Sequence, residues 1–245
     1  RQMCIRDRLE ALGWTIRMGL DVIRPEAVMG RNAELVEKAM VRAAEHGVPE
    51  SFLKATGGYT GLTADFDTGC EGPVTGFRFD MDCVLVEELH DASHLPAAEG
   101  FDSEIPGHMH ACGHDMHTAM LLGAAKILKA HESELDGMVK LMFQPAEEIF
   151  EGSKDMIASG VLENPRPDAA LMIHVAAGMP LPAGTVVVSA PDVSAPAADY
   201  FTIRVHGKGC HGSAPQNGID PLTAAAHILI ALPVSYTHLT LPTIC

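Results

Sequence analysis

The sequence of 245 residues lacks the features that mark several classes of protein. It has only 17 Lys and Arg against 32 Asp and Glu, so it has no excess of the basic residues that bind nucleic acids and anionic membranes. It has no uninterrupted apolar run of about 18 residues, so we predict no transmembrane helix. Its six cysteines are widely spaced, unlike those of a small disulfide-rich protein. We therefore expect a globular, cytoplasmic protein that binds neither nucleic acid nor membrane.

The two ends of the chain are related in an unusual way. Residues 1–7 can be encoded by the codons CGT-CAG-ATG-TGT-ATA-AGA-GAC, and the reverse complement of these codons encodes VSYTHLT, which stands at residues 234–240. Such a relation is typical of a sequencing adapter translated from both ends of an assembled fragment, and two genuine termini are the alternative. We therefore expect residues 1–8 and 234–245 to be adapter-like artefacts on a truncated chain, and we leave them out of the fold prediction.

The pattern of apolar and turn-forming residues predicts helices that alternate with strands. We expect helices at residues 9–20, 32–46, 114–131 and 153–159, and a last one that begins at Asp220-Pro221. We expect strands at residues 59–66, 74–79, 139–143, 169–173, 185–189 and 200–205. This alternation predicts an α/β fold with helices on both faces of a sheet, and residues 180–198 are the best candidate for a domain boundary. The helix at 114–131 is so rich in apolar residues that we expect it to be buried on more than one side.

Three of the predicted strands end in side chains that bind metals or transfer protons. One runs into Asp80-Met81-Asp82, the second into a turn that ends in Glu147-Glu148, and the third into His174. In open α/β sheets, ligands bind outside the carboxyl ends of the strands, so the three endings are expected to converge on one site. The alternative is that each polar ending is a solvated turn.

A dense group of metal-capable side chains occupies residues 108–117. It consists of His108, His110, Cys112, His114, Asp115 and His117. A thiolate and an imidazole two residues apart, at 112 and 114, face one point when Gly113 makes a tight turn between them. Zn²⁺ and similar ions take these donors, with carboxylates completing the coordination. The alternative is a set of helix-surface or core histidines, and the spacing is not that of a structural zinc finger.

The adjacent carboxylates of Glu147 and Glu148 supply the two further roles that such a site needs. On a loop, neighbouring side chains point in different directions, so one carboxylate can bind metal while the other takes a proton from water. Paired glutamates alone are common, and it is their place after a strand and a Gln-Pro-Ala turn that favours a catalytic role.

Four motifs within residues 57–232 resemble those of one enzyme family. In chain order they are MHACGHDMHTAMLLGAAKIL, KLMFQPAEEIFEGSKDMIASGVL, LMIHVAAG and VHGKGCHGSAPQNGIDPLTAA. Together they are similar to the aminoacylase and carboxypeptidase-like metal-dependent amidohydrolases, peptidase family M-twenty, subfamily D. That family includes hippurate, auxin-conjugate and aminobenzoyl-glutamate hydrolases. Residues 30–69 most resemble the aminobenzoyl-glutamate hydrolase branch.

The resemblance implies a fold and a set of metal ligands. Residues 9–190 would form the N-terminal part of a mixed-sheet catalytic domain, and residues 191–233 would begin a smaller α/β lid or dimerisation domain. Two divalent ions, Mn²⁺ or Zn²⁺, would be held by four side chains: Cys112, which bridges the two ions, with His114, Glu148 and His174.

The resemblance also assigns roles to residues that do not bind metal. Glu147 matches the general base. Asp82 matches the acid of the DMD motif, which contacts a metal ligand rather than the metal. His211 matches a lid-domain histidine that helps to stabilise the oxyanion and can be supplied across a dimer. Three histidines would flank the site without binding metal: His108, His110 and His117.

The activity implied in this way is hydrolysis of the amide bond of N-acyl amino acids or similar small amides, by a homodimer at full length. The chain departs from the family pattern at Ile149, where Gly is usual, and at Cys83-Val84-Leu85, where Ala-Leu-Pro is usual. The family's catalytic domain resumes after the lid and brings a further ligand histidine that this sequence does not contain, so we expect the fragment alone to be inactive. The alternatives are a dipeptidase or deacetylase of a neighbouring branch, a non-catalytic metal-binding relative, and a structural-zinc protein.

Overall fold

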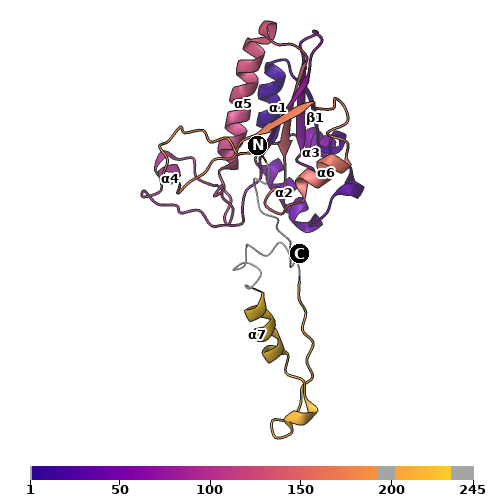
Figure 1. Ribbon diagram of the computed structural model, residues 1–245, viewed down its shortest axis with the longest axis vertical. Helices are drawn as coiled ribbons and strands as arrows, with labels where there is room; N and C mark the ends of the chain where they lie inside the picture. The colour runs from indigo at the N-terminus through magenta and orange to yellow at the C-terminus, as the bar shows by residue number, and fades with distance from the viewer. Residues whose placement is uncertain (1, 192–201, 233–245) are drawn as a thin grey trace. The chain divides into compact units, whose positions relative to one another are not determined.

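The computed structural model describes residues 2–191 and 202–232 and divides the chain into two compact units, Arg1–Pro180 and Leu181–Cys245 (Figure 1). The strands of unit 1 are β1 Thr15–Met18, β2 Leu62–Asp67, β3 Val74–Asp80, β4 Met138–Gln144 and β5 Ala169–Met172. Its helices are α1 Gln2–Ala11, α2 Ala33–Glu45, α3 Glu50–Thr56, α4 Leu95–Glu99, α5 His114–Ala130 and α6 Gly152–Ala158, with short 3-10 helices η1 Gly19–Asp21, η2 Pro25–Ala27 and η3 Glu132–Glu134. The described part of unit 2 contains η4 Pro215–Asn217 and α7 Pro221–Ala231.

The strands of unit 1 form one mixed sheet in the order β1-β2-β4-β3-β5. β1 pairs antiparallel with β2, and β2 pairs antiparallel with β4. β3 lies between β4 and β5 and runs parallel to both. The carboxyl ends of β3, β4 and β5 therefore meet at the same edge of the sheet. The polar residues that follow these three strands in the sequence begin at this edge.

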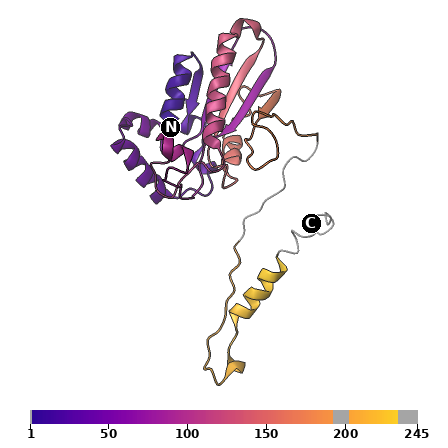
Figure 2. The same cartoon turned by 90° about the vertical axis from the view of Figure 1, so that its left-hand side faces the viewer.

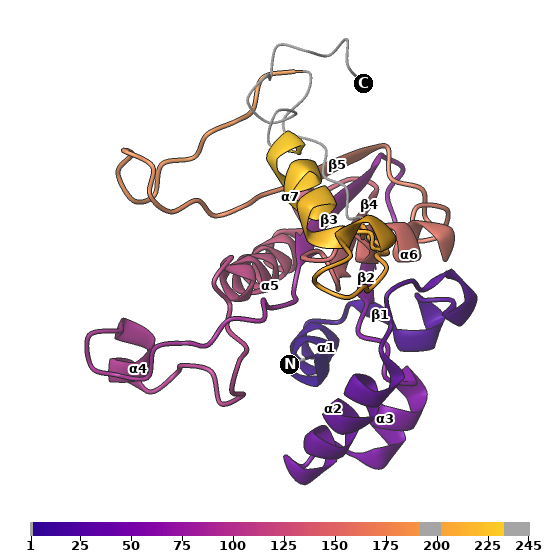
Figure 3. The ribbon, with the colours of Figure 1, turned by 90° about the horizontal axis from the view of Figure 1, so that it is seen from below.

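Helices cover both faces of this sheet, as the alternation of elements predicts. Successive side chains of a strand point to opposite faces, so Leu141 of β4 packs in one apolar cluster and Met142 in another. The first cluster holds Leu9 of α1 and Leu121 of α5, and the second holds Met156 of α6. Figure 3 shows α1 and α5 on one side of the strands and α6 on the other, and Figure 2 shows α5 running alongside them.

Two of the predicted helices start at a capping side chain. The Asn32 side chain accepts a hydrogen bond from the backbone N–H of Leu35 at the start of α2, at 3.1 Å. Asp220 accepts one from the N–H of Leu222 at the start of α7, at 2.9 Å. Both side chains satisfy an N–H that has no partner inside its helix. Among the described residues, no helix is both long enough and apolar enough to cross a membrane.

Three of the predicted elements are wrong, one near the start of unit 1 and two in unit 2. The helix expected at residues 9–20 ends at Ala11, because Gly13 turns the chain with φ of 80° into β1, which pairs with β2. No strand forms at residues 185–189 or 202–205, since neither has a neighbouring strand to pair with among the described residues. Tyr200 and Phe201 lie outside the described residues.

The prediction that α5 is buried on more than one side is also wrong. One face is buried through His114, His117, Thr118, Leu121 and Ala125. The opposite side exposes large apolar side chains, with Met116 55% and Ile127 64% exposed. α1 begins at Gln2, inside the segment set aside as an artefact, and its Ile5 lies in the core. Residues 234–245 lie outside the described part, so the assignment of both ends stays a prediction.

Candidate metal centre

Seven metal-capable side chains of unit 1 gather at the carboxyl edge of the parallel strands. Three overlapping groups, which share His114, each have ligand atoms within 4.8 Å of one another. Their members are Asp80, Cys112, His114, His117, Glu147, Glu148 and His174. The endings of β3, β4 and β5 therefore converge with the start of α5, as predicted from the sequence.

A glycine turn aims the thiol and the imidazole at this point. Gly113 precedes the first residue of α5 and has φ of 79°, a conformation that side-chain-bearing residues rarely adopt. A Cβ atom on Gly113 would lie 2.4 Å from Cγ2 of Val175. The backbone conformation and the close approach of Val175 both therefore require glycine at this position. The turn thus packs Val175, which follows His174, against Gly113, which lies between the two predicted ligands.

Asp82 joins two of the predicted ligands. Its Oδ1 lies 3.2 Å from Nδ1 of His114, and its Oδ2 accepts a hydrogen bond from the backbone N–H of Glu148 at 3.0 Å. A histidine that gives its Nδ1–H to a carboxylate presents Nε2 as a metal donor. Nε2 of His114 lies 3.6 Å from Oε1 of Glu148 and 3.8 Å from Oε2 of Glu147.

His174 faces Cys112 across the site. Its Nε2 lies 3.4 Å from Sγ of Cys112, while its Nδ1–H donates to the carbonyl oxygen of Val175 at 2.6 Å. The backbone carbonyl thus fixes the tautomer in which Nε2 is free to bind a cation.

Two atoms of this cluster show that a divalent cation fits it. Nε2 of His114 and Oε1 of Glu148 are both buried, and neither has a hydrogen-bond partner. Buried polar groups in folded proteins are nearly always partnered, so a pair left unpartnered 3.6 Å apart has the geometry of two ligands of one cation. Sulfur, imidazole and carboxylate donors together suit Zn²⁺ and its neighbours in the first transition row.

The loop between β4 and α6 is tightly wound around the two glutamates. Ala146 has φ of 54° and Phe150 has φ of 57°, both in the left-handed region that disfavours side chains. The backbone N–H groups of Glu151 and Gly152 both donate to the carbonyl oxygen of Ala146. Ile149 stands where the family usually has glycine, and the second left-handed residue of the loop is the one that follows it, Phe150.

Burial and neighbouring negative charge set the electrostatics of the site. Burial, followed by the charges of Asp80 and Glu148, raises the pKa of the Glu147 carboxyl, which makes it a better proton acceptor. Burial and the Glu148 carboxylate raise the pKa of the Cys112 thiol to about 11. A bound cation would offset this cluster of like charges.

Three further residues differ from the predicted ligands in where they lie or in how they were predicted. His211 belongs to unit 2, where its Nδ1 lies 2.8 Å from Oγ of Ser213, and its role in the site stays a prediction. Asp80 was predicted only as part of a strand ending that converges on the site, and His117 only to flank it; both are buried there and contact each other. The spacing of His114 and His117, three residues apart on one helix, is the signal that puts both rings on one face.

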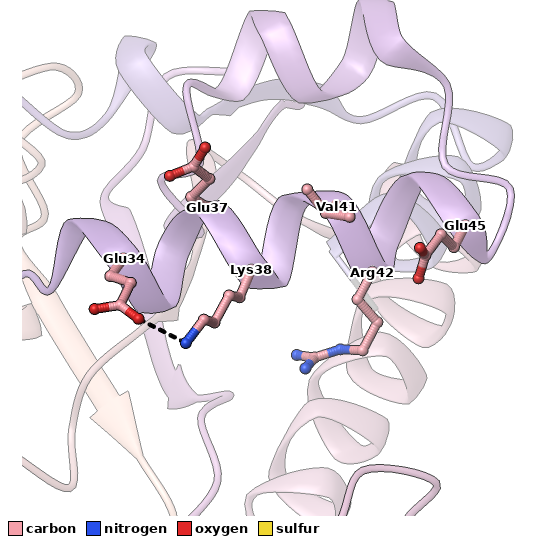
Figure 4. A pocket seen from close by; sticks show the side chains of 6 residues that line it. All are labelled: Glu34, Glu37, Lys38, Val41, Arg42 and Glu45. Carbon is pink, nitrogen blue, oxygen red and sulfur yellow. Dashed lines mark hydrogen bonds and ion pairs between the residues drawn. The ribbon is translucent and has the colours of Figure 1, made fainter.

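A hollow lies on α2, outside the metal cluster. It has a volume of ≈ 390 Å³, and its lining residues all come from this helix: Glu34, Glu37, Lys38, Val41, Arg42 and Glu45 (Figure 4). Lys38 and Glu34 form an ion pair at 2.6 Å. Because one helix supplies every wall, this hollow is a solvated helix face rather than a binding site.

Comparison with known proteins gives a consistent set of similarities. The sequence profile described as "Peptidase family M20/M25/M40" matches residues 76–236. The indole-3-acetyl-aspartic acid hydrolase of Enterobacter agglomerans is 40% identical over 237 residues, which cover 96% of this chain and 53% of that protein. One subunit of the p-aminobenzoyl-glutamate hydrolase of Escherichia coli (strain K12) is 38% identical, with the same coverage.

A solved structure gives the same result for the fold. The crystal structure of an aminobenzoyl-glutamate utilization protein from Klebsiella pneumoniae is 35% identical with a TM-score of 0.56, and covers 73% of this chain and 39% of that chain. The chain thus spans about half the length of the curated relatives it matches.

Proposed function

Because this chain belongs to peptidase family M20/M25/M40, we propose that it is part of a metal-dependent hydrolase that cleaves the amide bond of N-acyl amino acids or similar small amides. The single observation that carries this proposal is the convergence of a thiol, two imidazoles and two carboxylates around unpartnered, buried ligand atoms. The relatives named as hydrolases of indole-3-acetyl-aspartic acid and p-aminobenzoyl-glutamate support this substrate class.

Four residues would hold two divalent ions, Mn²⁺ or Zn²⁺: Cys112, His114, Glu148 and His174. When bound, such ions polarise a carbonyl oxygen and lower the pKa of water. The chain's own residues supply the rest. Asp82 holds the His114 ring and the Glu148 backbone in place.

Glu147 would act as the general base. It would take the proton from the attacking water and deliver it to the nitrogen of the leaving amine. Its raised pKa favours this role, and its side chain, 28% exposed, is open to a substrate. His211 would stabilise the oxyanion, from unit 2 or from the second copy of the chain in a homodimer.

The proposed domain organisation follows from the same assignment. Residues 9–190 would be the N-terminal part of the catalytic domain, and residues 191–233 the beginning of the lid or dimerisation domain. Residues 1–8 and 234–245 would be adapter-like artefacts. The complete protein would be cytoplasmic, and the fragment alone inactive.

The test is an assay of the complete protein, recovered from its uninterrupted gene. It would be offered indole-3-acetyl-aspartate, p-aminobenzoyl-glutamate and a panel of N-acetyl amino acids, with and without Mn²⁺ or Zn²⁺. Metal-dependent release of the free amino acid would support the proposal. Binding of metal without cleavage of any substrate would instead favour a non-catalytic metal-binding relative.

The Glu147→Gln variant tests the mechanism in the same assay. We expect it to keep its metal and lose about 10²–10⁴-fold in kcat, because the amide cannot accept the proton. Glu45→Gln, an exposed residue at the end of α2, is the matched control and should retain full activity. A Glu147→Gln enzyme with near-normal turnover would show that another group is the base.

A further inference from the structure

His117 is a fully buried histidine that the proposed ligand set does not use. It lies on α5 one turn after His114, and none of its side chain is exposed. Its ring stacks on the ring of His114, with centroids 5.1 Å apart, and meets the ring of His174 edge-on at 4.5 Å. It is therefore packed against two of the proposed ligands.

Both ring nitrogens of His117 already have partners. Nδ1 contacts Oδ1 of Asp80, and Nε2 accepts a hydrogen bond from the backbone N–H of Val175 at 2.9 Å. Because a backbone N–H can only donate, Nε2 carries no hydrogen, and the ring proton lies on Nδ1 facing the carboxylate. Asp80 is held in turn by Arg78, whose Nη1 lies 3.2 Å from Oδ2. A ring engaged in this way has no nitrogen left for a metal ion.

The partner of Nε2 is the residue that follows His174. The peptide N–H of Val175 is fixed by His117, and its carbonyl oxygen accepts the Nδ1–H of His174. Its side chain packs over Gly113, where a Cβ would lie 2.4 Å away. β5 ends at Met172, so His174 lies beyond the ladder that orders the strand. The position of His174 therefore depends on Val175, and that of Val175 depends on His117.

We propose that His117 is a positioning residue, anchored by Asp80, that places His174 opposite Cys112 by accepting the Val175 N–H. The proposal rests on the proposed function only in taking His174 as a metal ligand. A buried histidine that merely fills space would be replaced equally well by any side chain of similar size. A positioning residue requires a hydrogen-bond acceptor at the place of Nε2.

Two amide variants separate these two roles. In His117→Gln the side-chain oxygen can occupy the place of Nε2 and accept the Val175 N–H. In His117→Asn the shorter amide can still donate to Asp80 but does not reach Val175. We expect the Asn variant of the complete protein to bind Zn²⁺ about 10–100-fold more weakly, measured by competition with a chelator, and the Gln variant to bind nearly as tightly as the unchanged protein. Equal losses in both variants would overturn the proposal.

A metal-free measurement keeps the result independent of activity. Long-range ¹H–¹⁵N spectra of the unchanged protein should show His117 as the Nδ1–H tautomer, and an Nε2–H tautomer or an imidazolium would overturn the proposal. Exchange of the Val175 amide hydrogen should be faster in His117→Asn than in His117→Gln. His131→Asn and His131→Gln, at the exposed end of the same helix, are matched controls.

These measurements also separate the two proposals. If the unchanged protein binds metal but cleaves no amide, the proposed function fails while the affinities of the two variants still test His117. If the complete protein binds no metal, the tautomer and the Val175 exchange rates decide the positioning role alone.

Discussion

Gly113 is the residue on which the geometry of the site most directly depends. It lies between Cys112 and His114 with φ of 79°, and its missing Cβ leaves the space in which Val175 packs. Backbone conformation and close approach both exclude a side chain here. Gly123, in the interior of the same helix, offers the opposite case, because nothing lies within 4 Å of the place of its Cβ and it is helical.

We therefore predict opposite effects for the same substitution at these two positions. Gly113→Ala should lower the free energy of unfolding by about 2–3 kcal/mol, through backbone strain and the clash with Val175. Gly123→Ala should raise it by about 0.5–1 kcal/mol, because alanine favours the helix. Urea unfolding of the metal-free protein measures both. A Gly113→Ala protein as stable as its parent would mean that the turn is not held against Val175.

Single residues of the site differ in how far the sequence reveals them. Cys112, His114 and His174 could be predicted because their side-chain chemistry and their places at a turn or strand end are visible in the sequence. His117 could not be assigned in this way. Its role depends on the backbone N–H of Val175, 58 residues further along the chain, and a contact of that kind leaves no mark on composition or spacing.

At the scale of elements, β4 carries an unusual side chain on one face. Lys140 has none of its surface exposed, and its Nζ donates to the carbonyl oxygens of Val161 and Pro165 at 2.5 and 2.8 Å. Its cross-strand partner on β2 is Asp65, which also pairs with Arg17 at 2.7 Å. The buried ammonium thus ties the chain after α6 to the centre of the sheet.

We predict that Lys140→Met lowers the free energy of unfolding by about 3 kcal/mol at pH 7, since it removes one partner of a buried charged group and leaves two carbonyls without a donor. Lys38→Met, on the exposed face of α2, is the control and should change it by less than about 0.5 kcal/mol. Thermal and urea unfolding measure the difference. A small effect at Lys140 would mean that water replaces the ammonium group.

The stability that Lys140 contributes beside Asp65 depends on pH in a direction that can be predicted. Burial lowers the pKa of Lys140 below 10.5, although the Asp65 carboxylate acts in the opposite direction. Between the lowered pKa of folded Lys140 and 10.5, the Lys140 amine is protonated in the unfolded chain and neutral in the folded chain. Because the unfolded state then binds more protons, the contribution of Lys140 to the free energy of unfolding rises with pH. The stability difference between the parent and Lys140→Met should therefore widen from pH 7 towards pH 10.

The elements that could be predicted are those whose signal is local. α2 and α7 start at capping side chains, and β3, β4 and β5 are short apolar runs bounded by turns. Residues 185–189 are also a short apolar run, rich in β-branched side chains, but no strand forms there. A strand is completed only by its neighbour's backbone, and the sequence of one segment does not show whether that neighbour is present.

At the scale of the whole molecule, the candidate metal centre lies within unit 1. Its groups come from the ends of three parallel strands and the start of α5, which are far apart in sequence and joined only by the fold. Burial, followed by the negative charges of neighbouring carboxylates, raises the pKa values of Glu147 and Cys112, and a bound cation would offset both effects. Metal binding and folding stability are therefore linked.

Addition of Zn²⁺ or Mn²⁺ should accordingly stabilise the folded protein and a chelator should reverse the effect. A ligand that binds only the folded state adds about 2.7 kcal/mol at 100 times its Kd. Thermal unfolding at increasing metal concentration measures this in the complete protein. Cys112→Ser should lose most of the increase, because a hydroxyl is a far poorer donor than a thiolate for these ions. Glu147→Gln should keep it, because Glu147 is assigned to proton transfer. Equal increases in Cys112→Ser and the parent would place the metal elsewhere, and loss of the increase in Glu147→Gln would make that carboxylate a ligand rather than the base.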